Sequence, residues 1–356
     1  MDASGYQLFR LWSGICSIGV NLGLVWVAYL AALWLPAFNE FAGVVSLPVV
    51  ALLLSIVFIL AFLPFEILAG YAGETAFSRG QQSFREWLRD WSQSQWLVML
   101  GLVAGVCLFG WGGSQSLMWQ LIAVAGVCCS VAGFMMTLPF WIRQLGSMTT
   151  EHDPELEDDI NQELEKHGTK PLKVIILDDG DEEGVNGAIL PFHSDTFIIN
   201  QASGEELHAH ELAALALREQ WFHQRGQSTL CLTIVLGWVA AGALLALTLP
   251  SAWLQAASAL QLGLGGVAVM TSWCFLALLI WPPLNNRIML QADAYLAEKI
   301  GVEEMILLLN KIQTLNETDF DISEAKEHIF HPIPSLRKRL EHLSPPSSLP
   351  AEDYPS

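Results

Sequence analysis

The sequence predicts an α-helical integral membrane protein with about six transmembrane helices and an α+β region outside the membrane. Its residues are 53% hydrophobic and its mean hydropathy is +0.41, which is high for a soluble domain. Polar residues gather in two segments, 143–228 and 283–343. Six apolar runs reach the length of about 20 residues that a bilayer requires. These runs cover residues 14–36, 44–65, 96–113, 118–142, 229–249 and 257–282.

The six apolar runs contain no Lys, Arg, Asp or Glu. Tryptophans lie near many of their ends, where an amphipathic ring prefers the membrane interface. The first run is too long for the core of a cleaved signal peptide and is expected to stay as an anchor. Ion pumps and proton-coupled transporters need ionisable groups inside the bilayer. The absence of such residues from the six runs therefore argues against both classes.

Positive charge predicts the orientation of the spans. With the N-terminus inside, the outer loops are residues 37–43, 114–117 and 250–256, and none contains Lys or Arg. All 17 basic residues then lie on the cytoplasmic side. The positive-inside rule therefore predicts a multi-pass protein with both termini and both polar segments in the cytoplasm.

Charge and cysteine usage argue against a nucleic-acid-binding protein and against a zinc site or disulfide framework built from cysteines. The formal net charge of −19 disfavours nucleic acid as a partner, because phosphate binding needs Lys and Arg. The six cysteines all lie in apolar runs and lack the spacing of a zinc site or a disulfide framework. We interpret them as small buried residues.

Residues 1–142 form a four-span region with a connector at residues 71–95. Four apolar residues of this connector recur at helical spacing, with charged residues between them, which predicts an amphipathic helix at the membrane interface. They are Phe84, Trp87, Leu88 and Trp91.

Residues 143–228 form the main soluble insertion. Its acidic stretch, Glu151 to Glu165, predicts a solvated helix or linker. Three short apolar stretches predict strands, and a helix is expected at 205–224. The expected strands are residues 173–177, 187–191 and 196–200.

Residues 229–282 form two more transmembrane helices, the second of which is expected to end at Pro282 and Pro283. Residues 283–343 form further cytoplasmic helices, expected at 286–300, 303–315 and 336–343. The tail, residues 344–356, is rich in Pro and Ser and is predicted to be disordered.

This order of parts resembles the membrane-embedded zinc metallopeptidases of the CAAX prenyl protease type I and heat-shock membrane protease group. The similarity runs from about residue 40 to residue 345. It implies a cytoplasmic gluzincin-like domain that residues 283–343 complete. Five stretches carry it: the connector GETAFSRGQQSFREWLRDW, Val185–Ala188, the helix Glu211–His223, the helix Arg287–Ala297, and His331–Leu340, which resembles a closing His-Pro…Arg motif.

The resemblance also assigns five site positions. A catalytic zinc takes two histidines from an H-E-x-x-H helix and a third ligand from another helix. The histidine positions hold Arg218 and Phe222, and the third ligand position holds Met289. Glu219 occupies the position of the general base. Asp293 occupies the position of the carboxylate that lies behind the first histidine ligand. Arg and Phe offer zinc no lone pair and Met is a poor zinc ligand, so no metal or other cofactor is expected.

Two hypotheses follow for the altered positions. In the first, the Arg218 guanidinium takes the place of the metal's charge between Glu219 and Asp293, and Phe222 and Met289 fill the remaining volume. In the alternative, zinc binds in another way, through Glu219 with His223 or through Glu206 with His210.

The expected function is that of a pseudoprotease, which binds a peptide or a membrane or lipidated protein partner without cutting it. The strands between Gly187 and Asn200 would offer an edge for peptide addition. One alternative is an active membrane zinc metalloendopeptidase with an atypical metal site. Another is a structural membrane scaffold. In each case membrane lipid is a partner and nucleic acid is not.

Overall fold

The computed structural model describes residues 3–35, 37, 40, 45–76, 83–137, 149–178, 184–189, 195–253, 257–316 and 333–343. The chain divides into two compact units. The first comprises Met1–Met135 and Leu232–Ala277, and the second comprises Met136–Cys231 and Leu278–Ser356. Residues 317–332 and the tail that was predicted to be disordered, 344–356, lie outside the described residues.

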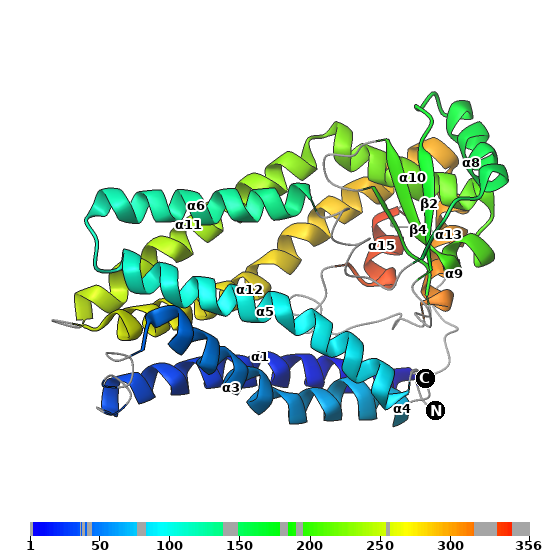
Figure 1. The fold of residues 1–356 in the computed structure, drawn as a ribbon. Helices are drawn as coiled ribbons and strands as arrows, with labels where there is room; N and C mark the ends of the chain where they lie inside the picture. Colours follow the sequence, from blue (N-terminus) through cyan, green and yellow to red (C-terminus); the bar gives the residue numbers. More distant parts are fainter. Residues whose placement is uncertain are drawn as a thin grey trace. The chain divides into compact units, whose positions relative to one another are not determined.

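Six helices of the described chain are long and apolar enough to cross a membrane, which confirms the six predicted spans. The protein is thus an integral multi-pass membrane protein with a mostly helical fold (Figure 1). The helices are α1 (Ala3–Trp34), α3 (Leu47–Glu66) with its extension η1 (Ile67–Ala72), α5 (Phe84–Gly112), α6 (Leu117–Met136), α11 (Gln227–Trp253) and α12 (Ala259–Ile300).

Three helices extend further than the sequence predicted. Helix α3 continues through the π-helix η1, so its candidate span, Leu47–Ala72, extends beyond the predicted end at residue 65 and includes Glu66. The amphipathic connector is not a separate helix, because its second half forms the first turns of α5. Helix α12 continues through Pro282 and Pro283, where the sequence analysis expected an end. Apolar helices tolerate such prolines because a helix remains the best way to pair backbone groups away from water.

Small residues allow close helix packing in the first unit. Ala32, Ala51, Ala243 and Ala268 are all fully buried. A Cβ added at Gly263 would lie 2.4 Å from the backbone oxygen of Val106. Without a hydrophobic driving force between helices in lipid, such backbone contact is what holds membrane helices together.

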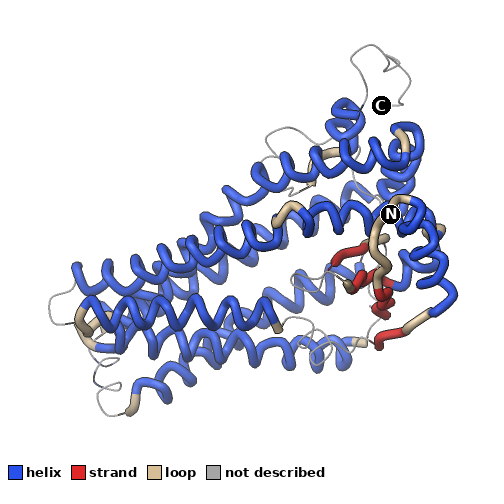
Figure 2. The backbone as a smooth tube through the Cα atoms, turned by 90° about the horizontal axis from the view of Figure 1, so that it is seen from above, coloured by secondary structure: helices blue, strands red, loops and turns tan. Residues whose placement is uncertain are grey.

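The second unit contains a four-stranded sheet of order β1-β2-β4-β3. Its strands are β1 (Thr149–Glu151), β2 (Lys173–Asp178), β3 (Gly187–Ile189) and β4 (Thr196–Asn200). Strands β2 and β4 are parallel, whereas β3 and β1 pair antiparallel with their neighbours. Three of these strands match the prediction, and β1 was missed. Strand β3 lies at one edge of the sheet, and Figure 2 shows all four strands gathered in one part of the fold.

Among the residues that the structure describes, five helices accompany this sheet, besides the C-terminal part of α12. They are α8 (Pro154–Lys166), α9 (Gln201–Glu206), α10 (Ala209–Gln224), α13 (Val302–Leu315) and α15 (Leu336–Leu343). The helix expected at 205–224 is therefore divided between α9 and α10. The acidic stretch forms α8, which is not merely solvated, because Ile160 and Leu164 on one face are fully buried.

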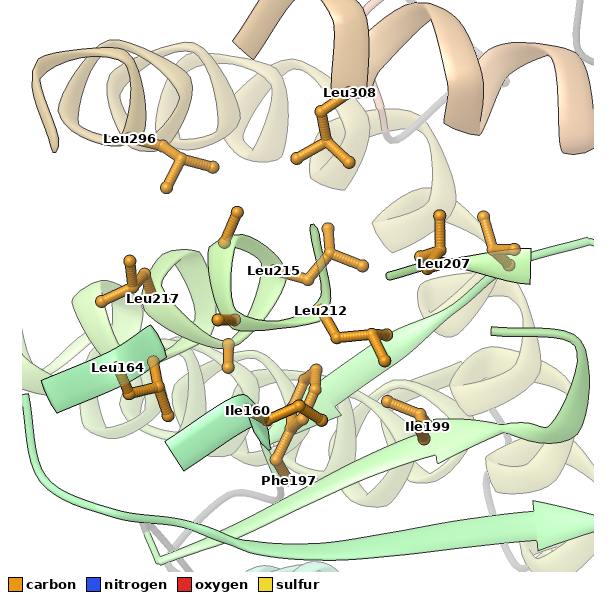
Figure 3. Packing of buried hydrophobic residues seen from close by; sticks show 14 of the residues in the cluster. Ile160, Leu164, Phe197, Ile199, Leu207, Leu212, Leu215, Leu217, Leu296 and Leu308 are labelled. Atoms are coloured by element: carbon orange, nitrogen blue, oxygen red, sulfur yellow. The ribbon is translucent and has the colours of Figure 1, made fainter. Parts of the chain in front are cut away.

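Helix α10 is the centre of this unit's core. Every residue from Leu212 to Leu217 is buried, and a helix that is apolar all round must be covered on all sides. Figure 3 shows its leucines between α8 and β4 on one side and α12 and α13 on the other. Burying one Leu contributes about 1.5–3 kcal/mol. This packing fixes the position of the next residues along α10, which are the site residues.

Candidate functional site

The N-terminal end of α10 is fixed by Glu211. Its carboxylate accepts a hydrogen bond from the His208 backbone N–H at 2.8 Å and an ion pair from Lys311 of α13 at 2.6 Å. Burial alone would raise the pKa of Glu211, but the Lys311 and His208 contacts outweigh it and hold that pKa below its ordinary value. Glu211 therefore serves to attach α10 to α13.

Arg218 and Glu219 lie side by side near the other end of α10 and form an ion pair. Two guanidinium nitrogens of Arg218 lie 3.3 and 3.4 Å from Glu219 Oε1. The side chains are 14% and 17% exposed, respectively. A strong charge-assisted hydrogen bond is shorter, about 2.7–2.9 Å. Adjacent helix residues do not face each other, which accounts for the long contact.

Glu219 also contacts the edge strand β3. Its carboxylate accepts a hydrogen bond from the backbone N–H of Ile189. The Asn200 N–H donates to the Asn186 carbonyl, so Asn186 and Asn200 form a hydrogen-bonded pair. Because such pairs alternate along an antiparallel ladder, the N–H of Ile189 points away from β4, toward the side of β3 on which the described residues place no further strand. Glu219 thus occupies a donor that a peptide added to this edge would use.

Burial dominates the ionisation of Glu219. It raises the pKa of this carboxyl above its ordinary value, although the Arg218 charge and the Ile189 N–H partly oppose the effect. A buried carboxylate with a raised pKa is a common property of functional sites. Here the same carboxylate is already bound to a cation and an amide.

One hypothesis expected Asp293 of α12 to pair with Arg218, but it does not. It forms a bidentate ion pair with Arg339 of α15, at 2.7 and 2.8 Å. The Asp293 side chain is fully buried and that of Arg339 is 9% exposed. A buried carboxylate needs a close, well-oriented cation, and the planar guanidinium of Arg339 supplies two parallel donors.

Arg339 was not among the predicted site residues. The stretch His331–Leu340 also contains Arg337, which is exposed and lies 3.9 Å from Glu341. Helical spacing could have identified the right arginine, because Arg339 shares a face with the apolar residues three before it and four after it, Leu336 and Leu343. His331 of the same motif lies outside the described residues.

The other two altered positions, Phe222 and Met289, are both half-buried. The ring of Phe222 contacts Trp221 edge-on at 5.5 Å between centroids. Trp221 in turn lies 6.0 Å from the Tyr295 ring and carries the Arg225 guanidinium over its face at 5.0 Å. This side of α10 is therefore aromatic. Contact between Phe222 and Met289 stays a prediction.

The residues at the expected zinc positions do not fit a zinc ion. Arg218 brings a permanent positive charge, Phe222 has no donor atom, and the thioether of Met289 is a poor zinc ligand. Elsewhere in the described part of the chain, no group of three or more His, Cys, Asp or Glu is placed to hold a metal. The His208 and His210 rings stack on each other at 5.8 Å.

The sequence matches no family model and no curated protein. The structure, in contrast, is similar to the crystal structure of Ste24p from S. mikatae. The TM-score is 0.67 at 15% sequence identity, and the similarity covers 95% of this chain and 99% of the other. The chain thus has the fold of Ste24p over nearly its whole length. At this identity the likeness shows the fold alone.

Proposed function

We propose that this chain is a membrane protein of the CAAX prenyl protease kind that no longer binds zinc or cuts peptides, and that it binds a peptide or protein partner at the membrane. Ste24p is a zinc metalloprotease of the CAAX prenyl protease type. Its fold supports the family resemblance of the sequence. The chain's own residues support the loss of activity.

The contacts of Glu219 are the observation that carries the proposal. A general base in a zinc peptidase must face a water bound to the metal. The Glu219 carboxylate instead contacts the Arg218 guanidinium and the Ile189 N–H. Arg218 cannot donate a lone pair, and its charge repels a metal ion.

Strand β3 supports the binding part of the proposal. An extended peptide can add to an exposed sheet edge through main-chain hydrogen bonds. Strand β3 is an edge of the sheet, and Ala188 at its centre is exposed. The expected partner is an extended segment of a membrane or lipidated protein. We place this edge in the cytoplasm, in keeping with the positive-inside distribution of Lys and Arg.

Metal content of the purified full chain tests the loss of zinc. We expect far less than one zinc per chain by elemental analysis. The triple variant Arg218→His, Phe222→His and Met289→Glu should bind about one zinc, because it supplies three ligands and leaves an open position. A matched variant that restores only Phe222→His and Met289→Glu should bind little zinc, because Arg218 remains.

Two results would overturn the proposal. One zinc per natural chain, lost together with peptide cleavage when Glu219 is changed to Gln, would establish the active alternative with an atypical site. Binding is tested with a photo-crosslinking residue at Ala188 and a synthetic peptide, with and without a farnesyl group. If neither peptide is captured above the level of a scrambled control, the scaffold alternative is favoured.

A further inference from the structure

Arg218 has an unused hydrogen-bond donor in the candidate site. Its two contacts with Glu219 run through Nε and Nη2, and both reach the same oxygen, Oε1. The other terminal nitrogen, Nη1, donates to no acceptor in the part of the chain that the structure describes, and it is not fully buried. A guanidinium carries five N–H donors in a planar fork. The donors on Nη1 are therefore available to another group.

The surroundings of Arg218 give such a group a strong effect. The Arg218 side chain is only 14% exposed, so little of its charge is solvated by water. A buried cation needs close acceptors, yet its contacts with Glu219 are long, at 3.3 and 3.4 Å. The second carboxylate that the sequence suggested, Asp293, is bound by Arg339 instead. Arg218 thus has one carboxylate partner where it could hold two.

Arg218 also lies where the edge strand β3 loses a donor. The Glu219 carboxylate accepts hydrogen bonds from both the Ile189 N–H and Arg218, so the guanidinium and this backbone group meet at one carboxylate. A peptide strand added to β3 cannot pair with the Ile189 N–H while Glu219 holds it. At this position the guanidinium replaces the backbone as the available donor.

The charges on the same face of α10 favour an anion. Arg218, Trp221, Phe222 and Arg225 follow one another at i, i+3, i+4 and i+7, which places them on one side of the helix. Arg225 is exposed, and its guanidinium lies over the Trp221 ring. It is about 10 Å from Arg218 along the helix axis. Two guanidiniums on one face repel a metal ion or an ammonium group and attract a carboxylate.

We propose that Arg218 binds a carboxylate of the peptide partner. The fork formed by Nη1 and the remaining N–H of Nη2 matches the two oxygens of a carboxylate. This carboxylate belongs to an Asp or Glu side chain or to the end of the peptide chain. Because the protein's own net charge is −19, recognition depends on this local cation and not on long-range attraction. The inference rests on the proposed function, since it assigns the chemical group that the site recognises in its partner.

Ligand-detected NMR on the full chain in maltoside detergent tests the site with small probes. We expect N-acetyl-leucine, which carries one carboxylate, to bind, and its neutral counterpart N-acetyl-leucinamide not to bind. Arg218→Gln should weaken the binding of N-acetyl-leucine by about tenfold or more. Arg337→Gln, which removes an exposed arginine of the same unit, should leave it unchanged. Failure of N-acetyl-leucine to bind the natural chain would overturn the inference.

A second variant, Glu219→Gln, separates recognition from folding. Its amide oxygen still accepts from the Ile189 N–H, while Arg218 loses its counter-ion, so N-acetyl-leucine should bind more tightly than to the natural chain. The double variant Arg218→Gln and Glu219→Gln leaves no buried charge at either position and should show no preference between the two probes. If Arg218 only neutralises Glu219 and water satisfies Nη1, the acid and the amide will bind equally in every variant, which would overturn the inference.

Peptides identify the source of the carboxylate, with the photo-crosslinking residue at Ala188. One peptide has a free C-terminus and no acidic side chain, a second is amidated and carries one Asp, and a third is amidated and neutral. Stronger capture of the first or the second supports the inference and names the source. Equal capture of all three would overturn it and leave peptide binding in place. Capture of none, together with binding of N-acetyl-leucine, would overturn the proposed peptide binding and leave the carboxylate site standing.

Discussion

The buried ion pair between Asp293 and Arg339 should be essential to the stability of the second unit. Asp293→Asn keeps the size of the side chain but removes its charge. The Arg339 guanidinium, 9% exposed, then remains buried without a counter-ion. Breaking a buried ion pair from one side costs about 3–5 kcal/mol, most of it the cost of the remaining charge. The two short hydrogen bonds, at 2.7 and 2.8 Å, place this pair in that range.

Urea unfolding in mild detergent, followed by circular dichroism, measures this loss. Asp90→Asn serves as the matched control, since it breaks an exposed pair with Arg89 and should cost at most about 1 kcal/mol. The double variant Asp293→Leu and Arg339→Met replaces both charges with apolar groups. It should recover most of the lost stability, because no buried charge remains.

Either of two results would contradict this role of the ion pair. If Asp293→Asn costs no more than the Asp90→Asn control, the pair does not hold the unit together. If the double variant is as unstable as the sum of the single variants, the loss comes from altered packing and not from an uncompensated charge.

Three further predictions concern the sheet, the ionisation of the site and the orientation. Gly187→Ala should cost about 1–3 kcal/mol, because its Cβ would lie 2.8 Å from the fully buried Phe197 ring. Gly204→Ala, with no atom nearer than 3.9 Å, should be neutral or stabilising in the same unfolding assay. The raised pKa of Glu219 means that the folded state binds its proton more tightly. The stability of the natural chain relative to Glu219→Gln should therefore be greatest near pH 4 and fall as the pH rises through that raised pKa; a flat difference would contradict it. A cysteine at Ser114 should react with an impermeant maleimide on intact cells, and reaction only after lysis would reverse the predicted orientation.

The fold could be predicted in outline because its strongest signals are local. Runs of about 20 apolar residues identify membrane helices without tertiary information, and all six appear in the structure. Helix ends were less predictable. Pro282 and Pro283 were expected to end the helix, although membrane helices tolerate proline. Strand β1 was missed because Thr149–Glu151 has neither apolar alternation nor length, and only its pairing with β2 makes it a strand.

The candidate site was only partly predictable for a different reason. The position of Glu219 on a buried helix followed from the pattern of α10, but the partners of a charge depend on elements far away in the sequence. Asp293 and Arg339 are separated by 46 residues, and the Ile189 N–H reaches Glu219 from another element altogether. The hypothesis of one guanidinium between two carboxylates was wrong because a second arginine was available. Each carboxylate has its own arginine.

The contact between Glu219 and Ile189 also limits how a partner could bind in the proposed function. A carboxylate is a stronger hydrogen-bond acceptor than a peptide carbonyl, so a peptide would not readily displace Glu219 from this N–H. The outward backbone groups of β3 that remain are the N–H and C=O of Gly187 and the C=O of Ile189. Because β3 is only three residues long, main-chain pairing alone could supply few bonds, each worth about 0.5–1.5 kcal/mol. Most of the affinity for a partner must then come from apolar contact, which is what a lipid group or a membrane segment would bring. A partner without such a group should bind weakly, in keeping with the membrane location of the chain.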